Sequence, residues 1–315
     1  MDQVRAYLTS QLLGNLAALL VMPILVVGVI QRVKARWAGR KGPPLMQLGY
    51  DLWRLARKRS VLSTTTTAVF QLAPYVVLVT ALGSACLVPL AGGPALASFR
   101  FDFVWFAYVW GLGRVALILG ALDTGSAFEG MGASREATFS AILEPALFLA
   151  AGALSLASGE RELSLLLVPQ VAGGAALVVW ASALVALVIV VQVEAARMPI
   201  DDPTTHLELT MIHEVMILDH SGRELAAVQW ASAIKLYVGL SVLATLMHPR
   251  TPGLPGVALH LGLCLALAAA LGLSESLIAR LKLRTIPQYL VVALSAGAVA
   301  LLAALAMAGR LGILR

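Results

Sequence analysis

Several ionisable side chains lie where a charged group is unusual, within or beside long apolar segments. They are the carboxylates Glu144, Glu194, Glu208 and Glu214, together with the imidazole of His213. A charge in such a segment is costly unless it is paired or faces water. Burial also brings the pKa values of Glu208, Glu214 and His213 toward neutrality, where groups relay protons well. This pattern predicts a proton-conducting or charge-sensing chain.

Three further groups are weaker candidates because they lie nearer the ends of the apolar segments: Asp123, Glu129 and Lys235. Lys235 has two interpretations, in which its ammonium either reaches the membrane surface or pairs with a buried carboxylate. A structural alternative also exists for the acids, namely that they only form ion pairs with Arg114, Arg197 or Lys235. Glu194 and Arg197 are three positions apart, which is the spacing of a pair on one helix face.

Cofactor chemistry finds little support in the sequence. His206 and His213 lie two helical turns apart, about 10 Å, which is too far for one metal ion without further ligands. Cys86 and Cys264 are two isolated thiols, whereas an iron–sulfur cluster needs about four thiolates. No Walker motif or Gly-rich nucleotide fingerprint is present. We therefore expect no metal, cofactor or redox centre on this chain, and a non-catalytic subunit if electrons move in its system.

The segments that carry these groups have the properties of membrane-spanning helices. Of the 315 residues, 59% are hydrophobic and 13% are charged. Apolar runs of about 20 residues are long enough to cross a hydrocarbon core as helix, and strand-like alternation is absent. We expect an all-α polytopic membrane protein in which residues 1–315 form one transmembrane domain with short amphipathic helices in its loops. The predicted spans are 12–31, 68–90, 103–122, 139–158, 171–193, 229–247, 256–275 and 288–308, the first retained rather than cleaved as a signal peptide.

Basic residues predict the orientation of these spans. The loops at one side, 32–67, 123–138, 194–228 and 276–287, contain 15 of the 23 lysines and arginines, whereas the other side contains six. Because loops rich in lysine and arginine stay in the cytoplasm, these four loops are predicted to be cytoplasmic. Both termini are then outside, and the protein is placed in the cell (inner) membrane.

The first and third of these loops are the predicted dock for soluble subunits. From Arg32 to Arg59 the first loop has nine basic residues and one acid, whereas the third has a net charge of −5. Such opposite charges offer complementary sites to a partner. The predicted docking residues are Arg40, Lys41, Asp51, Arg57, Arg197, Asp201 and Asp202. A leucine stripe over 45–58 leaves a second interpretation, a basic amphipathic helix that lies on anionic headgroups.

Local signals predict two helix starts in the loops. Asp202 before Pro203 has the form of an N-cap followed by proline at the first helical position. A helix is therefore expected from Thr204 to about His220, with Gly222 ending it. Ser134 marks the expected start of the helix that carries Glu144.

Four motifs extend over most of the chain. They are RKGPP with Gln47, Asp51 and Leu55; SREATF with Glu144-Pro145; EAARMPIDDPTTHLELTMIHE; and Pro287-Gln288-Tyr289-Leu290. Together they resemble the subunit 1 family of NADH dehydrogenase (complex I), in its energy-converting nickel–iron hydrogenase branch of the formate hydrogenlyase type. In the complex I branch the first motif ends in Gly-Pro-Asn, and Pro44 stands in place of that Asn. In that branch the third motif reads Glu, Arg, Pro-Phe-Asp, followed by three carboxylates at alternating positions. Here Glu208 fills the last of these three positions, and Thr204 and His206 fill the other two.

The resemblance implies a membrane-anchor and ion-coupling subunit that links a soluble redox arm to proton or sodium translocation. The implied partners are hydrogenase-like large and small subunits and a ferredoxin-like iron–sulfur subunit, which hold the nickel–iron centre and the clusters. Antiporter-like membrane subunits adjoin it. The alternative is a quinone-chamber subunit of a complex I-type NADH:quinone oxidoreductase. A stand-alone transporter is disfavoured because no internal repeat is visible, and a passive anchor is the remaining interpretation.

Overall fold

The computed structural model describes residues 2–169, 173–201, 211–251, 253–278 and 281–310. In this part of the chain all regular secondary structure is helical, and eight helices are long and apolar enough to cross a membrane. They are α1 (Asp2–Trp37), α3 (Ala68–Cys86), α4 (Asp102–Asp123), α5 (Ala127–Ser158), α7 (Gly174–Glu194), α8 (Gly222–Met247), α9 (Gly253–Leu277) and α10 (Ile286–Arg310). The predicted all-α fold with eight spans is confirmed, and the chain is a multi-pass membrane protein.

Four short helical elements connect these spans. They are α2 (Gln47–Ala56), α6 (Leu163–Leu166) and the 3-10 turns η1 (Glu214–Ile217) and η2 (Leu283–Thr285). Helix α2 is the amphipathic helix expected from the leucine stripe, and it begins after Pro43 and Pro44, which disfavour helix at the residues preceding them. Leu48 packs against the hydrophobic core, whereas Trp53 on the same helix is exposed.

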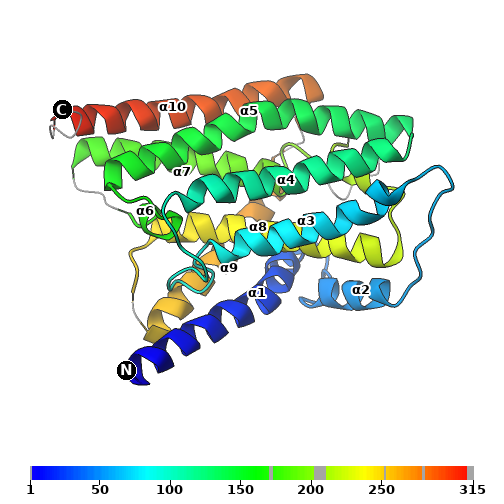
Figure 1. Cartoon of the computed structure of the whole chain (residues 1–315), viewed down its shortest axis with the longest axis horizontal. Helices are drawn as coiled ribbons and strands as arrows, with labels where there is room; N and C mark the ends of the chain where they lie inside the picture. The colour runs from blue at the N-terminus through cyan, green and yellow to red at the C-terminus, as the bar shows by residue number, and fades with distance from the viewer. Residues whose placement is uncertain (1, 170–172, 202–210, 252, 279–280, 311–315) are drawn as a thin grey trace.

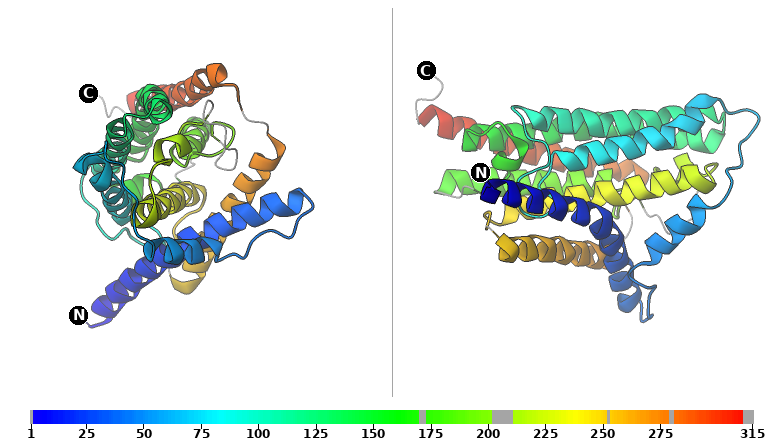
Figure 2. Two further views of the ribbon diagram at one scale, coloured as in Figure 1. Left: turned by 90° about the vertical axis from the view of Figure 1, so that its right-hand side faces the viewer. Right: turned by 60° about the horizontal axis from the view of Figure 1, so that its bottom comes forward.

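The spanning helices lie side by side around α8, which contacts α1, α2, α3, α7 and α9. Figure 2 shows α8 enclosed by the other helices, and its residues from Ala233 to Leu246 are buried without interruption. Helix α2 lies at one end of the bundle, whereas α1 begins and α10 ends at the opposite end (Figure 1). An even number of spans places both ends of the chain on one side, as the predicted topology requires.

Helix α1 is bent partway along its length (Figure 2), and Pro23 lies inside it. Proline removes one backbone hydrogen bond and pushes its ring against the preceding turn, which is a common cause of such a bend. After the bend, the segment before α2 packs directly on the backbone of α1. A Cβ atom added at Gly28 would overlap the carbonyl oxygen of Leu45. This close approach therefore requires glycine at position 28.

Two local predictions differ from the structure. Helix α5 begins at Ala127, before Ser134, so most of the predicted loop 123–138 is helical. In the described part of the stretch 204–220, η1 replaces the predicted α-helix, because the carboxylate of Asp201 accepts the backbone N–H groups of Ile212 (3.1 Å) and His213 (2.8 Å) across the loop. Gly222 has a φ of +54° and starts α8 rather than ending a helix. Asp202 and residues 203–210 lie outside the described residues.

Candidate functional site

Arg114, which α4 places in the interior of the bundle, contacts three carboxylates. Its Nη1 donates to Glu144 Oε1 at 2.6 Å, its Nη2 donates to Glu194 Oε1, and its Nε lies 3.4 Å from Glu136 Oε1. Glu136 and Glu144 come from α5, and Glu194 is the last residue of α7. The arginine therefore joins three spanning helices through charge-assisted hydrogen bonds and ion pairs. We call Arg114 and these three glutamates, together with Lys235 of α8, the Arg114 cluster.

Small residues on α4 make room for these polar groups. A Cβ atom at Gly113 would overlap Thr80 Oγ1 of α3 and would lie 3.5 Å from Lys235 Nζ. A Cβ atom at Gly111 would lie 3.4 Å from Glu144 Oε1. Glycine at position 113 therefore lets α3 approach the backbone of α4 beside Arg114, whereas a Cβ atom at position 111 would only touch Glu144 at an ordinary contact distance.

Lys235 is buried beside this arginine rather than extended to the membrane surface, with 9% of its surface exposed. Together with Arg114, Glu136 and Glu194 it lines an internal cavity of about 20 Å³, which has room for about one water molecule. Within the described residues, no carboxylate oxygen lies within 4.0 Å of its ammonium. Neither sequence interpretation of Lys235 is therefore correct as stated: it is buried near the carboxylates without a direct ion pair to them.

An open polar cleft of about 640 Å³ adjoins this internal cavity at the α2 end of the bundle. The cleft is lined by ionisable side chains from α1, α2, the end of α7 and the loop between α7 and α8: Lys34, Asp51, Glu194, Arg197, His213 and Glu214. Glu194, His213 and Ser232 line both cavities. These three residues therefore separate the open cleft from the charged interior.

Two groups in the loop beside the cleft have shifted pKa values. Burial, followed by the charge of Lys235, lowers the pKa of His213 to about 4, so this imidazole is neutral near pH 7. Burial, followed by the neighbouring Asp201, raises the pKa of Glu214 to about 7, although Arg197 acts in the opposite direction. Glu214 therefore binds and releases a proton near neutral pH at the mouth of the cleft.

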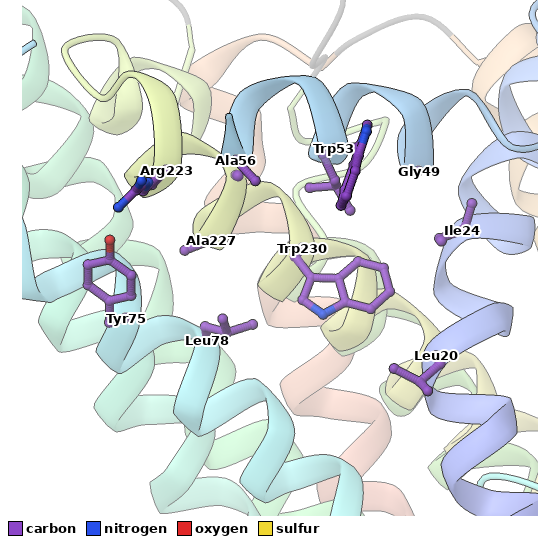
Figure 3. A pocket seen from close by; sticks show the side chains of 12 residues that line it. Leu20, Ile24, Gly49, Trp53, Ala56, Tyr75, Leu78, Arg223, Ala227 and Trp230 are labelled. Atoms are coloured by element: carbon purple, nitrogen blue, oxygen red, sulfur yellow. The ribbon is translucent and has the colours of Figure 1, made fainter. Parts of the chain in front are cut away.

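A second cavity, also of about 640 Å³, lies on the other side of α2 and is mostly apolar. Figure 3 shows it between α1, α2, α3 and α8, with Trp53 and Trp230 facing the opening from two of these helices. The Tyr75 hydroxyl points toward Arg223 at one end of this groove (Figure 3). Helix α2 thus forms a wall between the apolar groove and the polar cleft.

The predicted chain of titratable groups is brought together only in part. Glu144, Glu194, Lys235 and His213 lie in or beside the Arg114 cluster, and Glu214 lines the adjoining cleft, whereas Glu208 lies outside the described residues. Asp123 accepts the backbone N–H groups of Thr67 (2.7 Å) and Phe70 (3.1 Å) and so caps α3. The side chain of Glu129 is buried and accepts the N–H of Asp219 at 3.1 Å. The structure therefore places these two acids outside the cluster.

Sequence reasoning did not select Arg114 or Glu136 as site residues. Arg114 is a possible partner of the acids by its sequence position within an apolar span, but which acids it contacts depends on how three helices pack. Glu136 lies two residues after the expected helix start at Ser134, whereas α5 begins two turns earlier at Ala127, so the contact of Glu136 with Arg114 does not follow from the local sequence. The expected pair of Glu194 with Arg197 is wrong, because α7 ends at Glu194 and the chain then turns. Arg197 instead lies 3.7 Å from Glu275.

The predicted docking residues fall into two groups. Arg40, Lys41 and Arg57 are exposed at the α2 end of the bundle. Asp51 accepts hydrogen bonds from Gln47 (3.1 Å) and Arg54 (2.9 Å) within α2. Asp201 is 1% exposed and holds the loop before η1, so its carboxylate is not presented on the surface. Arg197 also has a mostly buried side chain.

Among the described residues, no group of three or more histidine, cysteine, aspartate or glutamate side chains is arranged to hold a metal ion. Cys86 is half-buried in α3 and Cys264 is buried in α9, and both are free thiols. The ion pairs of the Arg114 cluster and the raised pKa of Glu214 support ion pairing and proton exchange as the chemistry of the site.

The chain is similar to membrane subunits of bacterial redox complexes. Hydrogenase-4 component C of Escherichia coli strain K12 is 29% identical over 243 residues, which cover 77% of this chain and 76% of the relative. Formate hydrogenlyase subunit 4 of the same strain is 26% identical over 284 residues, covering 84% and 88%. One subunit of the NADH-quinone oxidoreductase of Methylococcus capsulatus is 26% identical over 205 residues, covering 63% and 65%.

A solved structure shares the fold. A chain of the membrane-bound sulfane sulfur reductase, an archaeal respiratory membrane complex, superposes with a TM-score of 0.79 at 18% identity. The superposition covers 95% of this chain and 99% of that chain. The family model described as NADH dehydrogenase matches residues 10–306, which confirms the resemblance drawn from the loop motifs. The chain therefore belongs to the NADH dehydrogenase family.

Proposed function

We propose that this chain is the membrane-anchor and ion-coupling subunit of a membrane-bound nickel–iron hydrogenase complex of the formate hydrogenlyase type. It holds a soluble redox arm at the α2 end of the bundle and links electron transfer there to proton or sodium movement. The observation that carries the proposal is that Glu194 lines the open cleft and also pairs with Arg114 in the interior. The similarity to hydrogenase-4 component C and formate hydrogenlyase subunit 4 supports it.

The charges of the Arg114 cluster explain how coupling works. With all groups ionised, three carboxylates face two cations, Arg114 and Lys235, so the cluster has one excess negative charge. Uptake of one proton by a carboxylate removes that excess in a setting where an unbalanced charge is costly. A change of charge in the cleft, on Glu214 or on a docked redox subunit, changes the electrostatic energy of the nearby Glu194 carboxylate, because the protein between them screens charges weakly. The cluster therefore takes up or releases a proton in response.

Glu144 is the end of this route that faces the outside of the bundle. Its side chain is 47% exposed although it lies inside a spanning helix. A carboxylate left against lipid at that position is costly, so a second membrane protein is expected to cover it. We propose that an antiporter-like membrane subunit packs against α4 and α5 here and continues the ion path from Glu144.

The exposed basic residues of the α2 end are the proposed dock for the soluble arm. This arm comprises hydrogenase-like large and small subunits and a ferredoxin-like iron–sulfur subunit, and these partners hold the nickel–iron centre and the clusters. Arg40, Lys41 and Arg57 are well placed to contact acidic surfaces of the arm, because long-range attraction steers and orients association. In this orientation the α2 end lies on the cytoplasmic side of the cell membrane, and both termini lie on the outer side.

Charge reversal tests this dock in the intact complex. Changing Arg40, Lys41 and Arg57 to glutamate is expected to release the soluble arm from membranes, and milder variants should make its attachment more sensitive to salt. The matched control reverses Arg100 and Arg161, which are exposed at the opposite end of the bundle. An arm that stays bound with unchanged salt sensitivity places the dock elsewhere.

The coupling role is tested with Glu144→Gln and Glu194→Gln in the intact complex. Glutamine keeps the size and much of the hydrogen bonding but does not titrate, so assembly should survive while proton uptake into vesicles is lost. Hydrogen evolution and proton uptake are measured on the same vesicles, with Glu160→Gln as a control outside the cluster. Full pumping in both variants contradicts the proposal. Failed assembly in both indicates that these acids act only as structural ion pairs.

The apolar groove favours a second candidate function, the quinone chamber of a complex I-type NADH:quinone oxidoreductase. Its volume of about 640 Å³ lies in the range of small-molecule sites, and it opens between helices beside the polar cleft. The similarity to one subunit of an NADH-quinone oxidoreductase fits this alternative. Quinone-dependent electron transfer by the purified complex, lost when Gly49 is changed to tryptophan to fill the groove, would select it over the hydrogenase role.

A further inference from the structure

A buried chain of hydrogen-bonding groups lies at the opposite end of α8 from the polar cleft. The hydroxyl of Ser241 contacts the carbonyl oxygen of Pro89 (2.7 Å) and Nε2 of His260 (2.9 Å). Nδ1 of His260 contacts Nε2 of His248 (3.3 Å), and Nδ1 of His248 contacts the carbonyl oxygen of Pro249 (2.7 Å). Four contacts thus run in series, with a carbonyl oxygen at each end.

Counting hydrogens shows that this chain is incomplete when it is neutral. Each of the four contacts needs one hydrogen, and the two carbonyl oxygens supply none. The Ser241 hydroxyl supplies one hydrogen and each neutral imidazole supplies one, which makes three. In the neutral state one contact therefore has two lone pairs facing each other. One additional proton gives every contact its hydrogen.

We propose that Ser241, His260 and His248 form a site that binds one excess proton, held as an imidazolium on the histidine pair. The two terminal carbonyl oxygens, of Pro89 and Pro249, accept the outermost hydrogens. Burial by itself disfavours an imidazolium. The complete chain offsets this, because hydrogen bonds from a charged donor are stronger than neutral ones and because a buried contact without its hydrogen is costly.

The groups around this site leave the histidine pair as its proton acceptor. On α8, the hydroxyl of Tyr237 donates to the carbonyl of Leu90. Cys264 lies one turn along α9 from His260 and is buried. Asn15 of α1 bonds the Leu87–Pro94 turn through Ala91 and Pro94, and Arg250 donates to the carbonyl of Ser164 at 2.5 Å. In the described ranges, no carboxylate bonds to either ring, so backbone carbonyls rather than an acid stabilise the proton.

The position of His248 gives the proton a way in. Both histidines are buried, with His260 0% and His248 8% exposed, but His248 directly follows the last residue of α8 and precedes the exposed Pro249. The site therefore exchanges protons with the side of the membrane on which α1 begins and α10 ends. It lies on the same helix as Lys235 but at the other end from the cleft, so the inference stands independently of the coupling role proposed for Glu194.

Solid-state 15N NMR of the histidine-labelled full chain in lipid bilayers tests the proposal. Ring nitrogens report protonation directly, and His248→Asn and His260→Asn identify the two signals. The expected result is one doubly protonated ring in the pair at pH values well above about 6.5, the ordinary histidine pKa. Two neutral rings down to about pH 6 would overturn the proposal. This wild-type titration is decisive whether or not a variant folds.

A variant of Ser241 tests the hydrogen count itself. Ser241→Ala removes one hydrogen and two contacts, so two neutral histidines then satisfy the two contacts that remain. The proton affinity of the pair is expected to fall at least about tenfold, which is one pH unit in the midpoint. Thr245→Val is the matched control on α8, because the Thr245 hydroxyl bonds only the backbone carbonyl of Ser241 (2.8 Å). An unchanged midpoint in Ser241→Ala would overturn the proposal.

Discussion

At the scale of single residues, Arg114 satisfies three acids that would otherwise be buried or lipid-facing charges without a counterion. Changing Arg114 to methionine leaves all three without this partner, and breaking a buried pair from one side typically costs about 3–5 kcal/mol. We expect a strongly lowered thermal stability of the purified chain. Adding Glu194→Gln to this variant should restore part of the loss, because the two residues are coupled. Independent, additive losses in the double variant would show that the contact contributes little.

Glu214 gives the protein a predictable response to pH. Its pKa of about 7 lies above the ordinary value of 4.5, so between these values the folded protein keeps a proton that the unfolded chain releases. This group therefore lowers stability progressively as the pH rises from about 4.5 to 7. Burial lowers the pKa values of His213 and His220 to about 4. These two histidines therefore lower the stability of the folded protein as the pH falls from about 6.5 to 4.

Comparison with Glu214→Gln isolates the contribution of Glu214. The glutamine variant keeps both histidines. The difference between its unfolding temperature and that of the wild type should therefore shift in favour of the variant as the pH is raised from about 5 to 8. Glu160→Gln, a change of an acid at the opposite end of the bundle, is the control and should follow the wild type. A temperature difference that does not change with pH would contradict the assigned titration of Glu214.

At the scale of elements, the position of α2 depends on its contact with α1. Because a side chain at Gly28 overlaps the Leu45 carbonyl, Gly28→Val is expected to push α2 away and to lower stability by about 1–3 kcal/mol. Gly14→Ala on the same helix has open space around it and should be neutral or slightly stabilising. Thermal unfolding in detergent measures both. Equal effects of the two substitutions would mean that the α1–α2 contact does not hold α2.

The elements also show what local sequence carries and what it does not. The eight spans were predictable because the hydropathy of a segment depends only on its own residues. Glu144, Glu194 and Lys235 were predictable for the same reason, as ionisable groups within or beside such segments. The start of α5 and the turn η1 were not, since packing creates the contacts around them, such as Glu129 of α5 with Asp219 and Asp201 with Ile212. The partners of Glu194 and Arg197 were missed for the same reason, because helix spacing alone favoured a pair that the end of α7 prevents.

At the scale of the whole molecule, the bundle has two chemically different ends. The α2 end carries the exposed basic residues and the polar cleft, whereas α1 begins and α10 ends at the other. We expect Arg57→Cys to react with a membrane-impermeant thiol reagent only from the cytoplasmic side, and Arg161→Cys only from outside. A variant lacking Cys86 and Cys264 provides the background. Labelling with the two sides exchanged would reverse the proposed orientation, and labelling of both from one side would contradict the bundle.

Helix α2 borders the polar cleft on one side and the apolar groove on the other, so a movement of α2 changes the size of both cavities at once. A displacement of α2 toward the cleft narrows the space around Asp51 and Glu194 and widens the apolar groove beside Trp53 and Trp230. An apolar molecule in the groove and a protein docked over the cleft are then linked ligands, each changing the affinity for the other by the same factor. If the chain has the proposed coupling role, acyl-chain length and membrane thickness are expected to regulate the activity of the complex through the occupancy of this groove.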